Sequence, residues 1–163
     1  MLRSYLQIIY SVIIVTSKYF KEAFDMDRQS VLVAFRNFKV DRSVLKEATR
    51  IARSNAADVC LLNVVERSNM LGVYNPVAED ELLTRAESEI AKAKEYLASE
   101  GIEASGLVKF GERSEIICEV ANKLKPFRVV IGNRGLKGIK RFLFGGVPER
   151  VVKASPCPVY VVE

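Results

Sequence analysis

Histidine is absent from this chain of 163 residues. Its absence excludes Ser-His-Asp and Cys-His catalytic arrangements, and it excludes metal sites built on imidazole, because these chemistries require that ring. Carboxylate, lysine and tyrosine side chains remain as the candidates for proton transfer. Nothing in the sequence pattern brings two of the acids together at one place, so we predict no catalytic residues.

Cysteine is scarce, with three residues at Cys60, Cys118 and Cys157. Their number is odd and no Cys-x-x-Cys motif occurs, which argues against a disulfide framework and against a zinc site. Cys60 falls in a predicted strand and Cys157 lies between two prolines. We therefore expect reduced thiols with a packing role, and we predict no metal site.

Long runs of Lys or Arg are also missing, although the net charge is +5. The positive balance favours anionic ligands. The charges are spread through amphipathic helices without interleaved aromatic residues, however, and this disfavours nucleic-acid binding. With 49% apolar and 28% charged residues, the chain is long enough to bury one core. These properties predict one compact cytoplasmic domain.

Two patterns of apolar residues alternate along the chain: short continuous runs, and residues repeated at helical spacing. Short apolar runs predict strands and apolar residues at helical spacing predict helices, which indicates an α/β fold with an open, doubly wound, mostly parallel sheet and helices on both faces. The predicted strands are 31–34, 58–65, 104–110, 128–131 and 158–162, and the predicted helices are one after Asp41, 77–99, 114–125 and one from Val147. Ligands of such sheets bind beyond the carboxyl ends of the strands, where the connection order reverses.

Three predicted helices carry specific expectations. Asp41 is placed to cap the first helix, and Glu112 and Arg113 to cap and solvate the start of the helix 114–125. The apolar stripe of the first helix is Val44, Leu45, Ala48, Ile51 and Ala52. The expected core side of the helix 77–99 is Leu82, Ala86, Ile90, Ala93 and Leu97. Glu89 belongs to the charged face of that helix, which we expect to be solvated.

The segment after the strand 128–131 is rich in glycine and in basic residues. Its glycines are Gly132, Gly135, Gly145 and Gly146. Its basic residues are Arg134, Lys137, Lys140 and Arg141. Glycine at position 132 permits backbone angles that a side chain would forbid, and Pro148 marks a helix start whose N–H groups and dipole would face an anion. Phosphate is the predicted ligand class; the alternative is tight turns with solvated basic residues.

The segment 132–162 resembles the C-terminal signature of the universal stress protein (UspA-like) family. The resemblance rests on the Gly-x2-Gly-x9-Gly spacing and on the segment 154–159, and it extends with lower similarity back to about residue 31. It implies a role in stress response, the adenine-nucleotide alpha hydrolase-like fold and a five-stranded sheet in the order 3-2-1-4-5. It also implies a universal stress protein domain over 29–163 and a homodimer through the C-terminal edge strand, whose exposed apolar edge favours pairing.

The resemblance further implies which residues would line a nucleotide. The phosphates of ATP would lie against Gly132, Asn133, Gly135, Gly145, Gly146 and Val147. The nucleoside would lie near Ala34, Arg36, Val64 and Ile131. No residue of the pattern would orient a water for hydrolysis, so the expected turnover is at most that of a slow ATPase.

Two positions depart from the pattern of the ATP-binding members. Arg36 stands where those members carry an Asp that contacts the nucleoside, and a guanidinium only donates hydrogen bonds. Gly146 stands where they carry Ser or Thr, so a hydroxyl that would contact phosphate is missing. Arg36 either helps to hold a different anion or is a surface or salt-bridged residue. The pocket therefore takes ATP or another phosphate-bearing ligand with weakened contacts, or it is the vestigial pocket of a nucleotide-independent dimeric interaction module.

Residues 1–28 form an apolar N-terminal extension outside the resemblance. The run 5–15 is short for a membrane span, and no small-x-small cleavage site follows it. Three interpretations remain open. The extension packs on the domain or on a partner, or it serves as a membrane anchor or secretory signal. It is alternatively an artefact of an upstream start site, since the sequence from Met26 resembles an ordinary family N-terminus. Membrane contact is expected only through residues 1–20.

Overall fold

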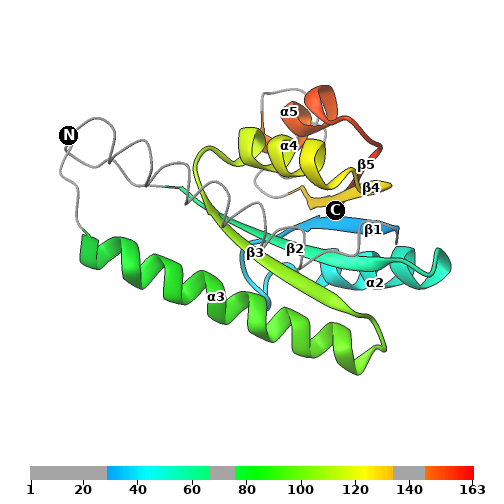
Figure 1. Ribbon diagram of the computed structural model, residues 1–163, viewed down its shortest axis with the longest axis horizontal. Coiled ribbons are helices and arrows are strands. Elements are labelled where there is room, and N and C mark those ends of the chain that lie inside the picture. Colours follow the sequence, from blue (N-terminus) through cyan, green and yellow to red (C-terminus); the bar gives the residue numbers. More distant parts are fainter. Residues whose placement is uncertain (1–28, 67–75, 134–145) are drawn as a thin grey trace, which may run out of the picture.

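The computed structural model describes residues 29–66, 76–133 and 146–163. These ranges form five strands and four helices in one α/β arrangement (Figure 1). In chain order the elements are β1 (Ser30–Ala34), α2 (Arg42–Ser54), β2 (Asp58–Val65), α3 (Pro76–Ser99), β3 (Ala104–Phe110), α4 (Arg113–Leu124), β4 (Arg128–Gly132), α5 (Val147–Ala154) and β5 (Val159–Val162). The predicted N-terminal extension and the segment 134–145 lie outside the described residues.

The sheet is parallel throughout and has the order β3-β2-β1-β4-β5. This order confirms the one that the family resemblance implies. β1 is the central strand, since Ala34 pairs with Leu62 of β2 on one side and with Ile131 of β4 on the other. The connection order therefore reverses between β1 and β4.

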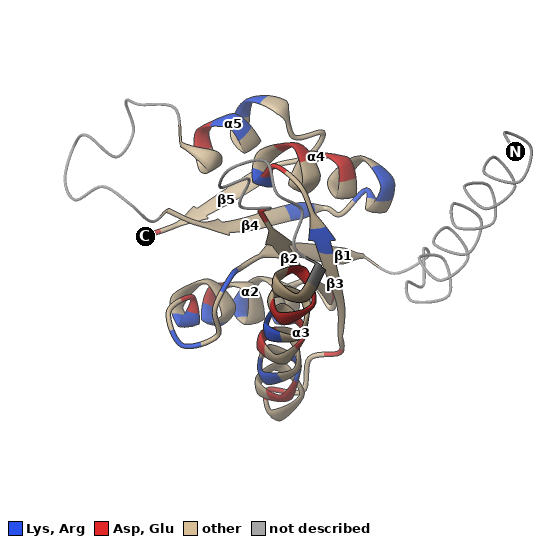
Figure 2. Cartoon of the chain, turned by 90° about the vertical axis from the view of Figure 1, so that its left-hand side faces the viewer, with Lys and Arg blue, Asp and Glu red and all other residues tan. Residues whose placement is uncertain are grey.

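The helices cover both faces of the sheet. α2 and α3 lie on one face and α4 and α5 on the other (Figures 1 and 2). The residues of β1 alternate between the two layers: Val31 and Val33 pack with α2 and α3, whereas Leu32 and Ala34 pack with α4 and α5. A parallel sheet buried on both faces requires such continuous apolar strands. Figure 2 also shows basic and acidic residues interspersed on all four helices.

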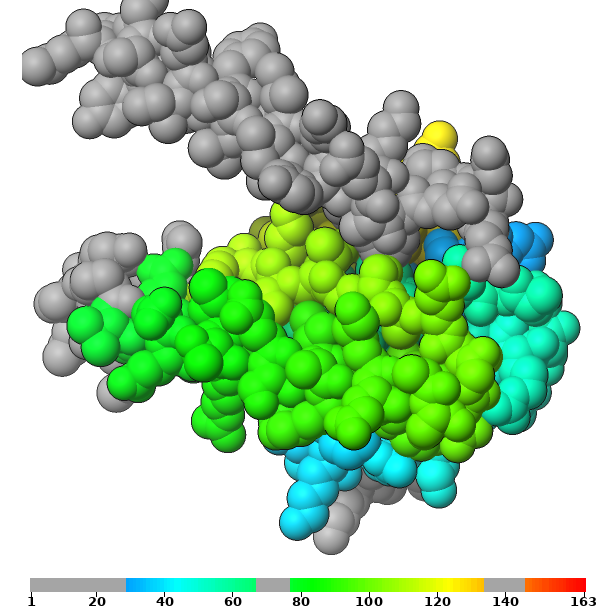
Figure 3. All heavy atoms as spheres, turned by 60° about the horizontal axis from the view of Figure 1, so that its bottom comes forward, coloured from blue at the N-terminus to red at the C-terminus, as the bar shows by residue number. Residues whose placement is uncertain are grey.

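The long helix α3 extends over β2 and the edge strand β3 and dominates one face of the molecule, with α2 beside it (Figure 3). Ala86, Ile90, Ala93 and Leu97 are buried as predicted. The expectation for Leu82 is wrong, because its side chain is 38% exposed; the first turns of α3 reach past the sheet (Figure 1). Gly101, at φ +74°, ends the helix region in a conformation that favours glycine.

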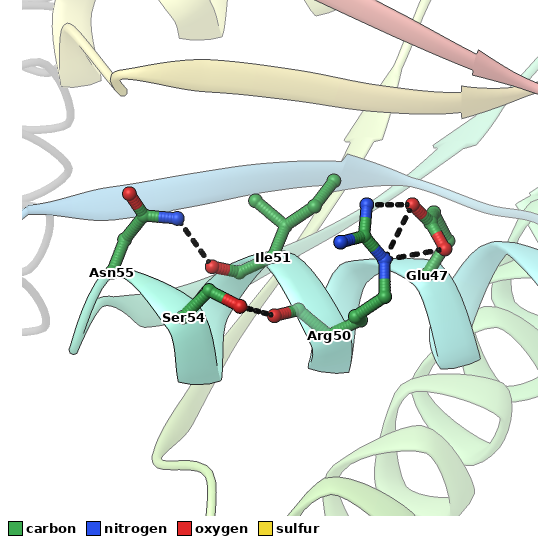
Figure 4. A network of polar contacts seen from close by, with 5 residues as sticks. All are labelled: Glu47, Arg50, Ile51, Ser54 and Asn55. Atoms are coloured by element: carbon green, nitrogen blue, oxygen red, sulfur yellow. Dashed lines mark hydrogen bonds and ion pairs between the residues drawn. The ribbon is translucent and has the colours of Figure 1, made fainter.

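Side-chain bonds complete the carboxyl end of α2 (Figure 4). Asn55 Nδ2 donates to the Ile51 carbonyl at 2.7 Å, and Ser54 Oγ donates to the Arg50 carbonyl at 2.9 Å. Arg50 also bonds Glu47 at 2.6 Å, which lowers the pKa of that carboxyl. The apolar stripe predicted for this helix is buried in full. Within the described ranges no helix is long and apolar enough to cross a membrane.

Candidate functional site

The candidate site lies where the chain leaves β1 and β4 at the carboxyl edge of the sheet. β1 leads into α2 on one face, and α5, which follows β4, lies on the other. Neighbouring parallel strands whose helices go to opposite faces leave a crevice beyond their carboxyl ends. Ala34 and Ile131, which pair directly, mark the two sides of this point.

The floor of the site is apolar. Ala34, Val64 and Ile131 are 8%, 5% and 5% exposed and belong to the cluster beneath α4 and α5. Val147, at the start of α5, packs against the same cluster. These four predicted residues therefore lie together, and they offer shape and burial but no polar contact.

The β1–α2 loop forms one wall, and buried acidic side chains hold it in place. Asp41 Oδ2 accepts hydrogen bonds from the backbone N–H groups of Arg36 and Asn37, at 2.8 and 3.0 Å. Asp41 occupies the N-cap position of α2, but its side chain makes no capping hydrogen bond, so the predicted capping role is wrong. The carboxylate accepts hydrogen bonds from N–H groups of the loop instead of from the first turn of the helix.

Glu89 of α3 is the second group that holds this loop. Its Oε2 accepts from the Phe38 N–H at 2.6 Å, and its Oε1 pairs with Lys92 at 2.7 Å. Burial opposes ionisation of Glu89, but the Lys92 and Phe38 contacts outweigh it and lower the pKa of the carboxyl. The expectation of a solvated Glu89 is wrong, because the side chain is buried. The arginine Arg42, whose guanidinium lies over the Tyr96 ring at 4.0 Å, adds a further contact between α2 and α3.

Gly132 ends β4 beside this wall. A Cβ at this position would lie 2.9 Å from Val44 Cγ2 and 3.5 Å from Asp41 Oδ1. Its φ is not among the positive values, which in the described glycines belong to Gly101 and Gly111. The predicted need for unusual backbone angles is therefore wrong at Gly132, and close packing against α2 explains the glycine.

The predicted phosphate contacts are only partly available. The backbone N–H of Asn133 donates to the Val162 carbonyl at 2.7 Å and so continues the β4–β5 ladder. Gly146 is the N-cap of α5, with extended backbone angles, φ −76° and ψ 169°, and Pro148 follows in the first turn. A Cβ at Gly146 would meet Pro148 Cδ at 3.6 Å, an ordinary contact. Gly135 and Gly145 lie outside the described residues.

A charged cluster lies across β1 from the glycines, at the ends of β2 and β3. Arg113 Nη2 lies 3.1 Å from Glu66 Oε2, and Asn63 Nδ2 donates to the Arg36 carbonyl at 3.1 Å. Burial and then the charge of Arg36 lower the pKa of Arg113. The expectation of a solvated Arg113 is wrong, because this residue is half-buried. Its position just after β3 is the signal that could have assigned it to this edge.

Glu112 confirms its predicted capping role. Its Oε2 accepts from the Glu115 N–H at 3.0 Å and from Ser114 Oγ at 2.5 Å. Burial raises the pKa of Glu112, but these hydrogen bonds and the charge of Arg150 outweigh it and lower the value. Arg150 of α5 lies 2.8 Å from Glu112 Oε1, so an ion pair links the N-terminal ends of α4 and α5.

The model of the universal stress protein family matches residues 27–163. The chain belongs to that family. The universal stress protein YxiE of Bacillus subtilis is 29% identical over 143 residues, which cover 81% of this chain and 97% of YxiE.

Solved universal stress proteins share the fold. The protein from Archaeoglobus fulgidus in complex with dAMP has a TM-score of 0.65 at 21% identity, covering 83% of this chain and 98% of that one. A universal stress protein in complex with cAMP has a TM-score of 0.65 at 23% identity, covering 83% and 97%. With the strand order, these neighbours confirm the adenine-nucleotide alpha hydrolase-like fold.

The thiols of this universal stress protein are free, and Cys60 is buried. Burial raises the pKa of Cys60 to about 12, so this thiol is protonated at neutral pH. Among residues 29–66, 76–133 and 146–163, no three His, Cys, Asp or Glu side chains gather to hold a metal ion.

Proposed function

We propose that residues 29–163 of this universal stress protein bind a nucleotide, ATP or a related phosphate-bearing ligand, at the carboxyl edge of the sheet. The observation that carries the proposal is that the chain leaves the paired strands β1 and β4 towards opposite faces of the sheet, above an apolar floor that also contacts the start of α5. A nucleoside would lie on that floor, with its phosphates towards Gly132 and the N-terminus of α5. Two structural neighbours that contain dAMP and cAMP support the ligand class.

The domain would act in stress regulation by ligand-controlled association, as a cytoplasmic homodimer paired through β5. The absence of histidine supports binding over catalysis. Turnover at the rate of a slow ATPase is the most that we expect. A phosphate-release assay beside a Gly132→Val variant, whose side chain would collide with Val44, measures that rate against a matched background. Residues 1–28 would be an extension separate from this domain.

A nucleotide-independent interaction module is the competing candidate. The Asn133 N–H, one of the predicted phosphate contacts, is already bonded to the Val162 carbonyl, and this favours a vestigial pocket. Arg36 favours it too, because its guanidinium cannot accept a hydrogen bond from a ribose hydroxyl.

Calorimetric titration of ATP and of 5′-AMP into the full chain distinguishes the two candidates. The comparison protein is an Arg36→Asp/Gly146→Ser double variant, which introduces an acceptor and a phosphate-facing hydroxyl. The extended angles at Gly146 accept a serine without strain, and a Cβ there makes an ordinary contact of 3.6 Å with Pro148 Cδ. The variant should therefore fold as the unaltered chain does.

Saturable binding of either nucleotide by the unaltered chain supports the proposed function. Binding gained only by the double variant overturns it and favours the interaction module. A Lys46→Ala variant, which removes an exposed cation from α2 outside the site, should bind as the unaltered chain does.

A further inference from the structure

We propose that Arg36 and Arg113 form a second anion site beside the proposed nucleotide pocket, and that this site takes a phosphate group on the ribose of the ligand. The ligand class is then a nucleoside bisphosphate, phosphorylated at the 5′ position and at the 2′ or 3′ position. The inference rests on the proposed function, because it specifies the ligand of the same pocket.

Three neighbouring strand ends bring the two arginines to one edge. The bond from Asn63 Nδ2 to the Arg36 carbonyl holds the backbone of Arg36 beside the last residues of β2. Glu66 follows β2 directly and pairs with Arg113 at 3.1 Å. The N–H of Gly111, just before the start of α4, donates to the Val65 carbonyl at 3.1 Å. Residues far apart in the sequence therefore meet in one place.

The site offers hydrogen-bond donors. The Asp41 carboxylate is engaged by two loop N–H groups, and Glu66 is engaged by Arg113. Arg113 Nε is buried without a hydrogen-bond partner. Within the described ranges, no hydrogen bond or ion pair joins the exposed Arg36 side chain to another residue. Such a set suits an acceptor-rich anion rather than a hydroxyl that must donate.

The charges around Arg113 also favour an anion at this site. Burial and then the charge of Arg36 disfavour the charged form of Arg113, and the acidic neighbours Glu66, Asp41 and Glu112 offset only part of this effect. The Arg113 guanidinium nevertheless stays protonated at neutral pH. A phosphate would place negative charge between two cations that now repel each other and would accept bidentate hydrogen bonds from them.

The position of the pair selects a phosphate on the ribose. Gly132 and α5 belong to the β4 side of β1, whereas Glu66 and Arg113 belong to the β2 and β3 side. A nucleoside on the floor of Ala34 and Val64 would have its 5′ phosphate on the first side and its ribose hydroxyls available to the second. Dinucleotide sites follow the same chemistry, in which a carboxylate binds a ribose hydroxyl and an arginine accommodates a ribose phosphate.

Binding titrations with isomeric ligands test the inference. The full chain is titrated with 5′-AMP, 5′-ADP, adenosine 2′,5′-bisphosphate, adenosine 3′,5′-bisphosphate and inorganic phosphate. The bisphosphates are isomers of 5′-ADP, so they control for the number of phosphates. We expect one bisphosphate to bind at least about tenfold more tightly than 5′-AMP and 5′-ADP, as a charge-assisted pair implies. Arg36→Ala should remove most of that preference, and the control Lys46→Ala should keep it.

The possible outcomes distinguish a preference for bisphosphates from the proposed nucleotide binding on which it rests. Equal affinity for the bisphosphates and 5′-ADP, or a preference that survives Arg36→Ala, overturns the inference while the nucleotide function stands. Inorganic phosphate that binds as tightly as the bisphosphates also overturns it, because the site then recognises a free anion. Failure of every nucleotide to bind overturns both proposals. Binding of 5′-AMP by Arg36→Ala at unchanged affinity shows that the variant is folded.

Discussion

Asp41 stabilises the loop that precedes α2 through one carboxylate oxygen. The side chain is 4% exposed and accepts from two backbone N–H groups. Without it, those donors would lose their partner in a partly buried place, where an unsatisfied polar group is costly.

Asp41→Ala should lower the free energy of unfolding by about 2–3 kcal/mol, the cost of leaving such donors unsatisfied. Urea denaturation of the variant beside Lys46→Ala, a solvent-facing substitution on the same helix, measures the difference. A loss no larger than that of Lys46→Ala would mean that water replaces the carboxylate.

Glu89 makes stability depend on pH in a predictable direction. Its pKa in the folded protein is lowered, so the ionised form contributes stability above the ordinary glutamate value of 4.5 and loses it as the pH falls through the lowered value. Glu89→Gln keeps an oxygen that can accept from Phe38 but has no charge for Lys92.

Glu89→Gln should destabilise the protein by about 1 kcal/mol at pH 7, and the difference should shrink as the pH falls below 4.5 and vanish below the lowered pKa of the folded protein. Urea titrations of both proteins between neutral and acidic pH supply the curves. A difference that persists unchanged at low pH would assign the effect to packing instead of charge.

At the scale of elements, Gly132 sets how closely α2 approaches β4. The distance of 2.9 Å between a Cβ there and Val44 Cγ2 leaves no room for a methyl group, and a β-branched valine cannot turn away freely. Gly132→Ala should therefore destabilise the protein by about 1–3 kcal/mol through overpacking.

A double-mutant cycle with Val44→Ala identifies the cause. Removing the Val44 methyls relieves the collision, so the loss in the double variant should be smaller than the sum of the single losses by about 1 kcal/mol. Strict additivity would indicate that the glycine matters for another reason. Gly146→Ala, where the nearest contact is 3.6 Å, is the control without a collision.

The elements themselves were largely predictable from local pattern. β2 and β3 have the predicted bounds, because apolar strand residues bounded by polar turns carry a strong signal. The buried Glu89 was not predictable in this way, since its partner Phe38 lies 51 residues away and a helix pattern does not reveal which loop will cover a charge. Asp41 matched a capping pattern, but the orientation of its side chain depends on the β1–α2 loop, which local propensity does not describe.

At the scale of the whole molecule, β5 is the edge that a second copy would pair with. The carbonyls of Pro158 and Val162 accept from β4, so strand alternation directs the N–H of Val161 to the free edge. Val161→Pro should remove that donor and convert the proposed dimer to a monomer, while the β4–β5 pairing is retained.

Sedimentation velocity of the unaltered chain, Val161→Pro and Val161→Ala measures this directly. Val161→Ala keeps the N–H and should remain dimeric. A dimer that survives the proline substitution would place the interface elsewhere, and a monomeric unaltered chain would contradict the proposed homodimer.

The central position of β1 also affects how the protein is made. β1 is synthesised early, but one of its partners in the sheet, β4, begins 97 positions later, with Val31 opposite Arg128. Until β4 has left the ribosome, one edge of the central strand has no neighbour, and an unpaired apolar edge is prone to wrong pairing. A nascent chain that ends after α4 should therefore depend on chaperones, and protease resistance should arise only once β4 has been synthesised.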